Sequence, residues 1–188
     1  MDKKLLAADI CGVGFVAAGA WFMRQLYEWS GHELLGILFG AVNGSIWEAC
    51  KTLLLPFLIW SVLELLSIRM PLHRFVAAKT AALYLLGFSY ILLRLLSFGD
   101  VSAAALSLCA ATVLSLVLFH APLPQNALFA PSVVLLFLFV SLYFSLTPFA
   151  PHNPVFLDKA TGMYGLIPDD LDYGAIALDA MTKSHIFR

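Results

Sequence analysis

Five apolar runs constrain this sequence more than any other feature. Each is close to the roughly 20 residues that an α-helix needs to cross about 30 Å of hydrocarbon. The runs cover approximately residues 5–23, 46–66, 75–96, 101–119 and 128–146. Hydrophobic residues make up 61% of the chain and charged residues 12%, whereas about a quarter of the residues in a water-soluble domain are charged. We therefore predict an all-α fold, a polytopic bundle of five transmembrane helices.

The first run has some features of a secretory signal peptide, because Lys3 and Lys4 precede it. Asp9 lies near its start, however, and no small-residue cleavage motif follows it. We expect this run to be retained as the first span.

Basic residues near the span ends predict the orientation, since cytoplasmic loops are rich in Lys and Arg. With the N-terminus inside, five basic residues fall on the cytoplasmic side and two on the other: Lys3, Lys4, Arg69, Arg74 and Lys79 against Arg24 and Arg94. The predicted location is the cell membrane, with a cytoplasmic N-terminus and an extracytoplasmic C-terminus.

Residues 147–188 differ in composition from residues 1–146, which form the predicted bundle. They contain four of the nine prolines but still carry many large apolar side chains. A disordered tail is poorer in such residues. We predict an ordered extracytoplasmic tail that packs on the bundle and includes a short helix from Asp169 or Asp170 to about Met181.

The charge and the motifs of the sequence limit the kinds of partner and cofactor that the chain can bind. The net charge is −1, and no block of Lys or Arg is long enough to neutralise a run of phosphates, so we expect the lipid bilayer and not nucleic acid as a partner. Cys11, Cys50 and Cys109 form no CxxC pair and are predicted to be buried free thiols. No P-loop, nucleotide fingerprint or Ser-His-Asp order is visible, and no cofactor is predicted.

The stretch between the first two runs is not a simple loop. Ser30 to Glu33 and Ser45 to Glu48 both match the S-x-x-E capping box that begins a helix. A helix over about residues 31–42 reaches only about 18 Å, which is too short to cross. It is apolar all round, so we predict one short, buried element that is broken or re-entrant.

Glycines recur every four residues in this stretch, at Gly36, Gly40 and Gly44. The spacing predicts a smooth face that another backbone approaches closely. Glycine-interrupted segments at membrane depth either form binding sites in transporters and channels or serve as packing devices. The sequence leaves both interpretations open.

Ionisable side chains within the spans are candidates for function, because a charge at a helix centre costs about 2.5 to 3.5 kcal/mol on insertion scales. Glu48 and Lys51 lie three residues apart on one helix face and are predicted to pair, either as a structural ion pair or as a substrate or proton site. Glu64 lies about 24 Å farther along and is expected in a separate structural ion pair. Lys79 and Arg94 are expected to snorkel to the headgroups.

Two segments carry a family resemblance. Residues 43–51, Asn-Gly-Ser-Ile-Trp-Glu-Ala-Cys-Lys, precede Pro56 and resemble the Asn-Glu-Ser-Val-Trp-Glu-His-Leu-Lys signature of a family of small, uncharacterised prokaryotic multi-spanning membrane proteins. Residues 155–165 resemble that family's C-terminal Pro-Leu-Phe-x-Asp and Thr-Gly-x-Tyr-Gly segment. Gly44 replaces an acidic residue and Ala49 replaces the histidine, so any role of that histidine is absent here. The resemblance implies the fold and the residues of interest but no reaction.

The candidate ligand site combines polar residues of the helix break with one tyrosine of the tail: Asn43, Ser45, Trp47, Glu48, Lys51 and Tyr164. For the tryptophan, an interfacial anchor is the simplest alternative. Four further residues on the same predicted side are candidates for binding a divalent cation or for acid–base chemistry: His32, Glu33, His152 and Asp158. They lack the spacing of a known zinc motif.

Three classes of function follow. The first is small-ligand binding or transport through the polar break at 43–51, which a polar cavity beside Glu48 would favour. The second is a structural or accessory subunit of a membrane complex, with another chain in a groove along the fourth and fifth spans. The third is an intramembrane enzyme in which the extracytoplasmic histidines and carboxylates converge.

Overall fold

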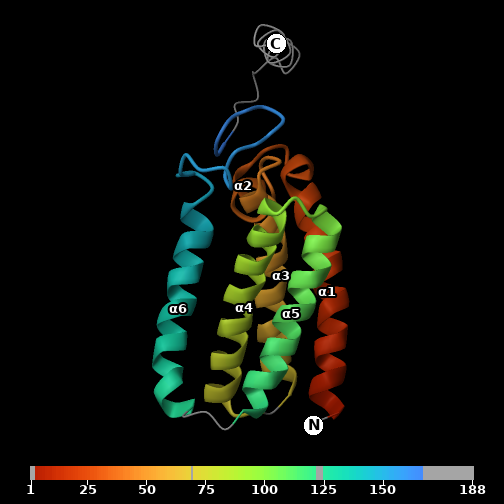
Figure 1. The fold of residues 1–188 in the computed structure, drawn as a ribbon, viewed down its shortest axis with the longest axis vertical. Helices are drawn as coiled ribbons and strands as arrows, with labels where there is room; N and C mark the ends of the chain where they lie inside the picture. The colour runs from red at the N-terminus through yellow and green to blue at the C-terminus, as the bar shows by residue number, and fades with distance from the viewer. Residues whose placement is uncertain (1–2, 69, 122–124, 167–188) are drawn as a thin grey trace, which may run out of the picture.

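The computed structural model describes residues 3–68, 70–121 and 125–166, and this part of the chain contains six α-helices and no strand. They are α1 (Lys3–Trp29), α2 (Leu34–Phe39), α3 (Ile46–Ser67), α4 (Leu72–Leu95), α5 (Asp100–His120) and α6 (Gln125–Ser145). All but α2 include a segment long and apolar enough to span a membrane. The predicted all-α bundle of five spans is confirmed, and Figure 1 shows the long helices side by side with α2 at one end.

Four of the five spans begin and end within three residues of the predicted positions, whereas α1 continues six residues past Met23. These extra residues, Arg-Gln-Leu-Tyr-Glu-Trp, are mostly good helix formers. The helix stops where Gly31 and His32 adopt left-handed φ angles of 66° and 64°. Such angles reverse the chain direction, so the next segment folds back along α1.

Helices α3 and α4 pack against each other at the centre of the bundle. Helix α1 covers α3, while α5 and α6 both pack on α4. The largest core side chains without appreciable exposure are those of Tyr90, Leu83 and Leu86 on α4. Helix α3 has the largest buried share of the five spans. Its ionisable residues Glu48, Lys51 and Glu64 are all buried inside the protein.

The thiols do not follow the prediction of uniform burial. All three cysteines are free, as expected, and Cys50 is buried, but Cys11 and Cys109 are exposed on the helix surfaces. A bilayer covers apolar side chains as well as a protein core does. A small apolar residue in a span therefore need not face inward.

The segment before α3 is re-entrant but shorter and less buried than predicted. Helix α2 has six residues instead of about twelve, and Leu34 and Leu35 are 67% and 62% exposed. After α2, the amide of Ala41 donates to the carbonyl of Met23, which lies about 9 Å down α1 from its end. The chain thus dips into the bundle before α3 starts, without crossing it.

Close packing of this segment on α1 confirms the function of two of the three spaced glycines. A Cβ atom on Gly36 would lie 2.8 Å from the Cα atom of Tyr27 in α1, and one on Gly40 would lie 2.9 Å from the amide nitrogen of Tyr27. Gly44 instead faces a side chain, the carboxylate of Asp158. Backbone atoms cannot move aside as a flexible side chain can, so the α1–α2 contact requires glycine.

We expect Gly40→Ala to destabilise the protein by about 1–3 kcal/mol, because the methyl group overpacks rigid backbone. Gly14→Ala is the matched control: nothing lies within 4 Å of a Cβ at Gly14 in the middle of α1. Alanine there is expected to be neutral or to stabilise by up to about 1 kcal/mol. Unfolding of both variants in mixed detergent micelles measures the difference, and equal effects would contradict the close α1–α2 contact.

The tail after α6 returns over the end of the bundle that carries α2, which we call the α2 end (Figure 1). Leu157 and Tyr164 form an isolated antiparallel bridge, so this part of the tail is a compact loop. The amide of Trp47 in α3 donates to the carbonyl of Val155 in the tail at 3.0 Å. The predicted helix from Asp169 or Asp170 lies outside the described residues.

Candidate functional site

The start of α3 is built by local hydrogen bonds. The hydroxyl of Ser45 accepts from the amide of Glu48 at 3.3 Å, which confirms Ser45 as the N-cap. The other half of the predicted capping box is wrong, because the Ser45 amide donates to the side chain of Asn43 at 2.9 Å. The Glu48 carboxylate is therefore free to point into the bundle.

The other predicted capping box, from Ser30 to Glu33, is also wrong. The Ser30 hydroxyl donates to the carbonyl of Tyr27 at 2.9 Å, and Glu33 precedes α2 without a side-chain cap. Gly31 and His32 form a left-handed turn between Ser30 and Glu33, so these two side chains cannot reach each other's backbone amides as a capping box requires.

Glu48 and Lys51 form the predicted ion pair, with 2.8 Å between Oε2 and Nζ. The side chains are 2% and 0% exposed. A third residue completes the network: the Thr147 hydroxyl donates to Glu48 Oε1 at 2.7 Å and accepts from Lys51 Nζ at 2.9 Å. The charge pair on α3 is thus joined at the α2 end to the turn that directly follows α6.

Both charged groups also bind backbone atoms of the re-entrant segment before α3. Lys51 Nζ donates to the carbonyl of Ile37 in α2 at 3.3 Å, and Glu48 Oε2 accepts from the amide of Val42 at 3.2 Å. The ring of Tyr143 lies 5.8 Å from Nζ, within cation–π range. The pair satisfies backbone groups that would otherwise be buried without partners, which explains why charge is tolerated here.

The tail covers this network. The side-chain Nδ2 of Asn43 donates to the carbonyl of Gly165 at 2.7 Å, and the rings of Trp47 and Phe156 lie 5.6 Å apart. Trp47 is only 8% exposed, so its interpretation as an interfacial anchor is wrong. Tyr164 stacks on His152 at 4.7 Å. All six predicted ligand-site residues therefore belong to the α2 end, but Tyr164 lies in the covering loop and not in the charge network.

Two polar groups near the network have no hydrogen-bond partner among the described residues. They are the indole Nε1 of Trp47 and the hydroxyl of Tyr143, and both atoms are buried. An unpaired buried donor costs about 1–3 kcal/mol.

The candidate metal residues do not converge. His32 stacks on Tyr27 and lies 3.5 Å from Glu28, while His152 stacks on the tail tyrosine. Asp158 accepts from the amide of Ala160 and the hydroxyl of Thr161 in its own loop. Among the residues that the structure describes, no three His, Cys, Asp or Glu side chains form a group that could hold a metal ion.

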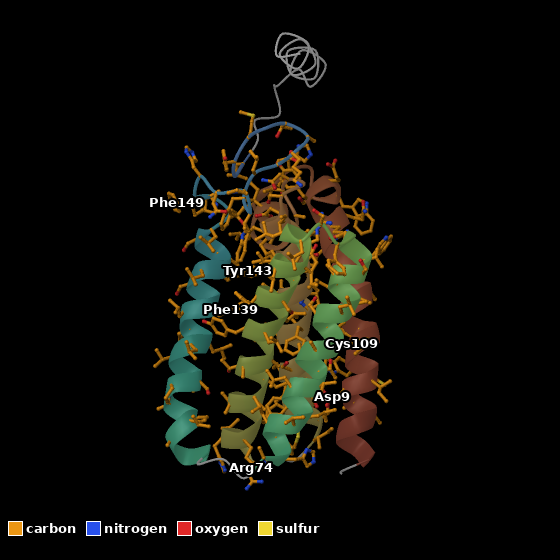
Figure 2. All side chains as sticks on the ribbon, in the orientation of Figure 1. Asp9, Arg74, Cys109, Phe139, Tyr143 and Phe149 are labelled. Atoms are coloured by element: carbon orange, nitrogen blue, oxygen red, sulfur yellow. The ribbon has the colours of Figure 1, made fainter. Side chains whose placement is uncertain are left out.

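A second charge cluster lies at the other end of the bundle and was not predicted. Lys79 of α4 contacts Asp9 of α1 at 2.8 Å and Glu64 of α3 at 2.7 Å. Glu64 is thus an ion-pair member as expected, but Lys79 is 8% exposed and does not snorkel. We call Asp9, Glu64 and Lys79 the carboxylate–lysine triad. Asp9 and Tyr143, both labelled in Figure 2, lie toward opposite ends of the bundle.

Further ion pairs at the α2 end connect α1, α4 and α5. Arg24 pairs with Asp100, which also accepts a hydrogen bond from Tyr90. Arg94 Nη1 donates to the carbonyl of Phe98 at 2.9 Å, and its side chain remains 29% exposed. Arg24 and Arg94 thus keep partial exposure while both contact Asp100, so they tie the ends of α1, α4 and α5 together.

Comparison with known proteins identifies the family. Residues 3–166 match DUF6512, a family of unknown function. This protein belongs to the DUF6512 family. No curated protein and no solved structure matches the chain. The match covers all six helices and the covering loop, so both charge clusters lie within the region that defines this DUF6512 protein.

The sequence predicted the pairing of Glu48 with Lys51 on α3. It did not indicate Thr147 or Tyr143 as their neighbours, because contacts between helices leave no local pattern. It also missed the triad. The available signal was the presence of Asp9 and Lys79 inside apolar runs, since isolated charges there require partners. Which charges meet depends on helix packing, which hydropathy does not report.

Proposed function

We propose that this DUF6512 protein binds or transports a small polar ligand at the α2 end, where the Glu48–Lys51–Thr147 network is the closed form of the site. The observation that carries the proposal is a fully buried charge pair at a helix break. Transporters place ligand sites at such breaks, where unwound backbone lines the site. A solute with an acceptor for Lys51 and a donor for Glu48 would replace contacts that the chain now makes to itself.

The contacts most readily exchanged are those to non-helical segments. Thr147 lies just after α6, and the loop from 41 to 45 precedes α3. Neither segment belongs to a transmembrane helix, so displacing them requires no helix to unwind, and hydrogen bonds to Asn43 and Trp47 hold the loop that covers them. Local opening of such a segment requires less free energy than global unfolding. The predicted orientation would place this entrance on the extracytoplasmic side.

Water access to position 147 tests this proposal without knowledge of the ligand. In a background with Cys11 and Cys109 replaced by serine, the variant Cys50→Ala with Thr147→Cys carries one thiol inside the network. The reference protein carries only the two serine replacements and therefore keeps Cys50 as its single thiol. We expect a water-soluble maleimide to label position 147 in native membranes at least about ten times faster than it labels Cys50 in the reference protein. Both positions are buried, at 3% and 0% exposure, so global unfolding would expose them equally.

A mixture of small amino acids is the first probe for protection, because such molecules carry both a donor and an acceptor. Slower labelling of position 147 in its presence would support a ligand site. If both thiols react at one rate that follows global unfolding, the network is a permanent scaffold, and the alternative of a structural or accessory subunit is favoured instead.

A further inference from the structure

The carboxylate–lysine triad contains more acid than base. Lys79 has one ammonium group between two carboxylates, those of Asp9 and Glu64. Asp9, Glu64 and Lys79 are only 5%, 2% and 8% exposed. With every group ionised, the triad holds one uncompensated negative charge in a region with little water. Such a charge is strongly disfavoured in a medium of low dielectric constant.

Carboxylate oxygens without a hydrogen-bond partner show where the uncompensated negative charge lies. Within the described residues, Asp9 Oδ2 and Glu64 Oε1 are buried and have no hydrogen-bond partner. The ammonium group also lies near the rings of Phe57 and Phe75, with 5.8 and 5.5 Å from Nζ to the ring centroids. The rings stabilise the cation but offer the carboxylates no donor. A proton on one carboxyl group would remove the net charge and supply the missing donor.

The triad is reached from two sides. A groove with about 420 Å³ of open space, lined by α1 and α3, includes Glu64, Cys11 and Trp60 and extends to Ser67 at the end of α3. A second space of about 100 Å³ between α3 and α4 includes Lys79. The larger groove has room for several water molecules. Glu64 therefore lies between the interior and a route to the surface of the bundle.

Neighbouring helices add few ionisable groups. The thiol of Cys11 lies in the same groove as Glu64, and α6 contributes the apolar Leu136 to the smaller space. The remaining described ionisable side chains of α5 and α6 are Asp100, Cys109, His120 and Tyr143. None of these four lines either space. Among the described residues that line the two spaces, Glu64 and Lys79 are thus the charged ones.

We propose that Asp9, Glu64 and Lys79 form a proton-binding site that exchanges a single proton with water through the groove between α1 and α3. The proton adds to a carboxylate oxygen of Asp9 or Glu64, and the charge of the triad changes from −1 to 0. Lys79 stays protonated between the two. Membrane proteins that couple proton movement to other events use buried carboxyl groups of this kind. The inference does not depend on ligand binding at the α2 end.

Infrared titration of the purified protein in lipid nanodiscs tests the proposal. A protonated carboxyl group has a C=O band that a carboxylate lacks. We expect wild type to show one such band above about pH 5, where ordinary carboxyl groups are ionised, and to lose it reversibly at higher pH. Asp9→Asn and Glu64→Gln are each expected to abolish the band, because the remaining carboxylate and Lys79 form a neutral pair.

Glu28→Gln is the control, because Glu28 is a carboxylate whose side chain is 72% exposed at the surface. It should leave the band unchanged. Absence of a titrating carboxyl group in wild type would overturn the proposal. So would a midpoint that falls as sodium replaces a large organic cation, since the triad would then bind a metal cation in competition with the proton. Survival of the band in both neutralised variants would assign the proton to another residue.

Discussion

Replacing Lys79 with methionine is expected to lower the free energy of unfolding by about 3–5 kcal/mol, the largest effect of any single substitution in the carboxylate–lysine triad. The variant leaves Asp9 and Glu64 buried without the cation that both contact at 2.7–2.8 Å. Titration with a denaturing detergent in mixed micelles measures the change. Lys159→Met is the matched control, because Lys159 is exposed in the tail.

Neutralising the two acids as well distinguishes a loss of stability caused by buried charge from one caused by altered packing. The triple variant Asp9→Asn, Lys79→Met, Glu64→Gln contains no ionised group, and we expect it to recover most of the lost stability. A loss in Lys79→Met no larger than in Lys159→Met would show that the triad makes no net contribution to stability. Failure of the triple variant to recover would assign the loss to packing around the lysine stem.

The second large effect is expected at the α2 end. Glu48→Gln and Lys51→Met should each cost about 3–5 kcal/mol, because either one leaves a fully buried charge without its partner. The double variant should recover part of this loss and not all of it. The carbonyl of Ile37 and the hydroxyl of Thr147 still lose the lysine as donor.

The coupling between the two residues is read from a double-mutant cycle of unfolding free energies. A coupling of at least about 2 kcal/mol is expected. Glu28→Gln, which removes an exposed partner of His32 at 3.5 Å, should change stability by less than about 1 kcal/mol. Strictly additive losses for Glu48 and Lys51 would show that each acts through the backbone contacts alone.

Local sequence signals predicted the spans and the break well. Each span is a property of about 20 consecutive residues, and the apolar runs of α3 to α6 locate them to within three residues. Ser45 was recognised as a helix start because an N-cap depends only on residues within one turn. The pairing of Glu48 with Lys51 is also local, since side chains three apart share a helix face.

Predictions failed where a residue's surroundings come from elsewhere in the chain. Lys79 near the start of a span is expected to snorkel, yet two acids on other helices hold it inside. Trp47 is buried because Phe156 of the tail covers it. Asp9 lies 70 residues from Lys79 and Phe156 lies 109 residues from Trp47, while Glu64 is on a different helix from Lys79, so no local spacing rule connects these partners.

The amino-acid sequence by itself determined that this chain forms a bundle of apolar helices, where α3 begins, and that Glu48 and Lys51 pair. Hydropathy, capping and i,i+3 spacing act within a few turns and need no knowledge of the fold. Only the tertiary structure decided that Thr147 closes this pair and that Asp9, Glu64 and Lys79 meet at the opposite end. A buried charge requires some partner, but which one it finds depends on how the helices pack.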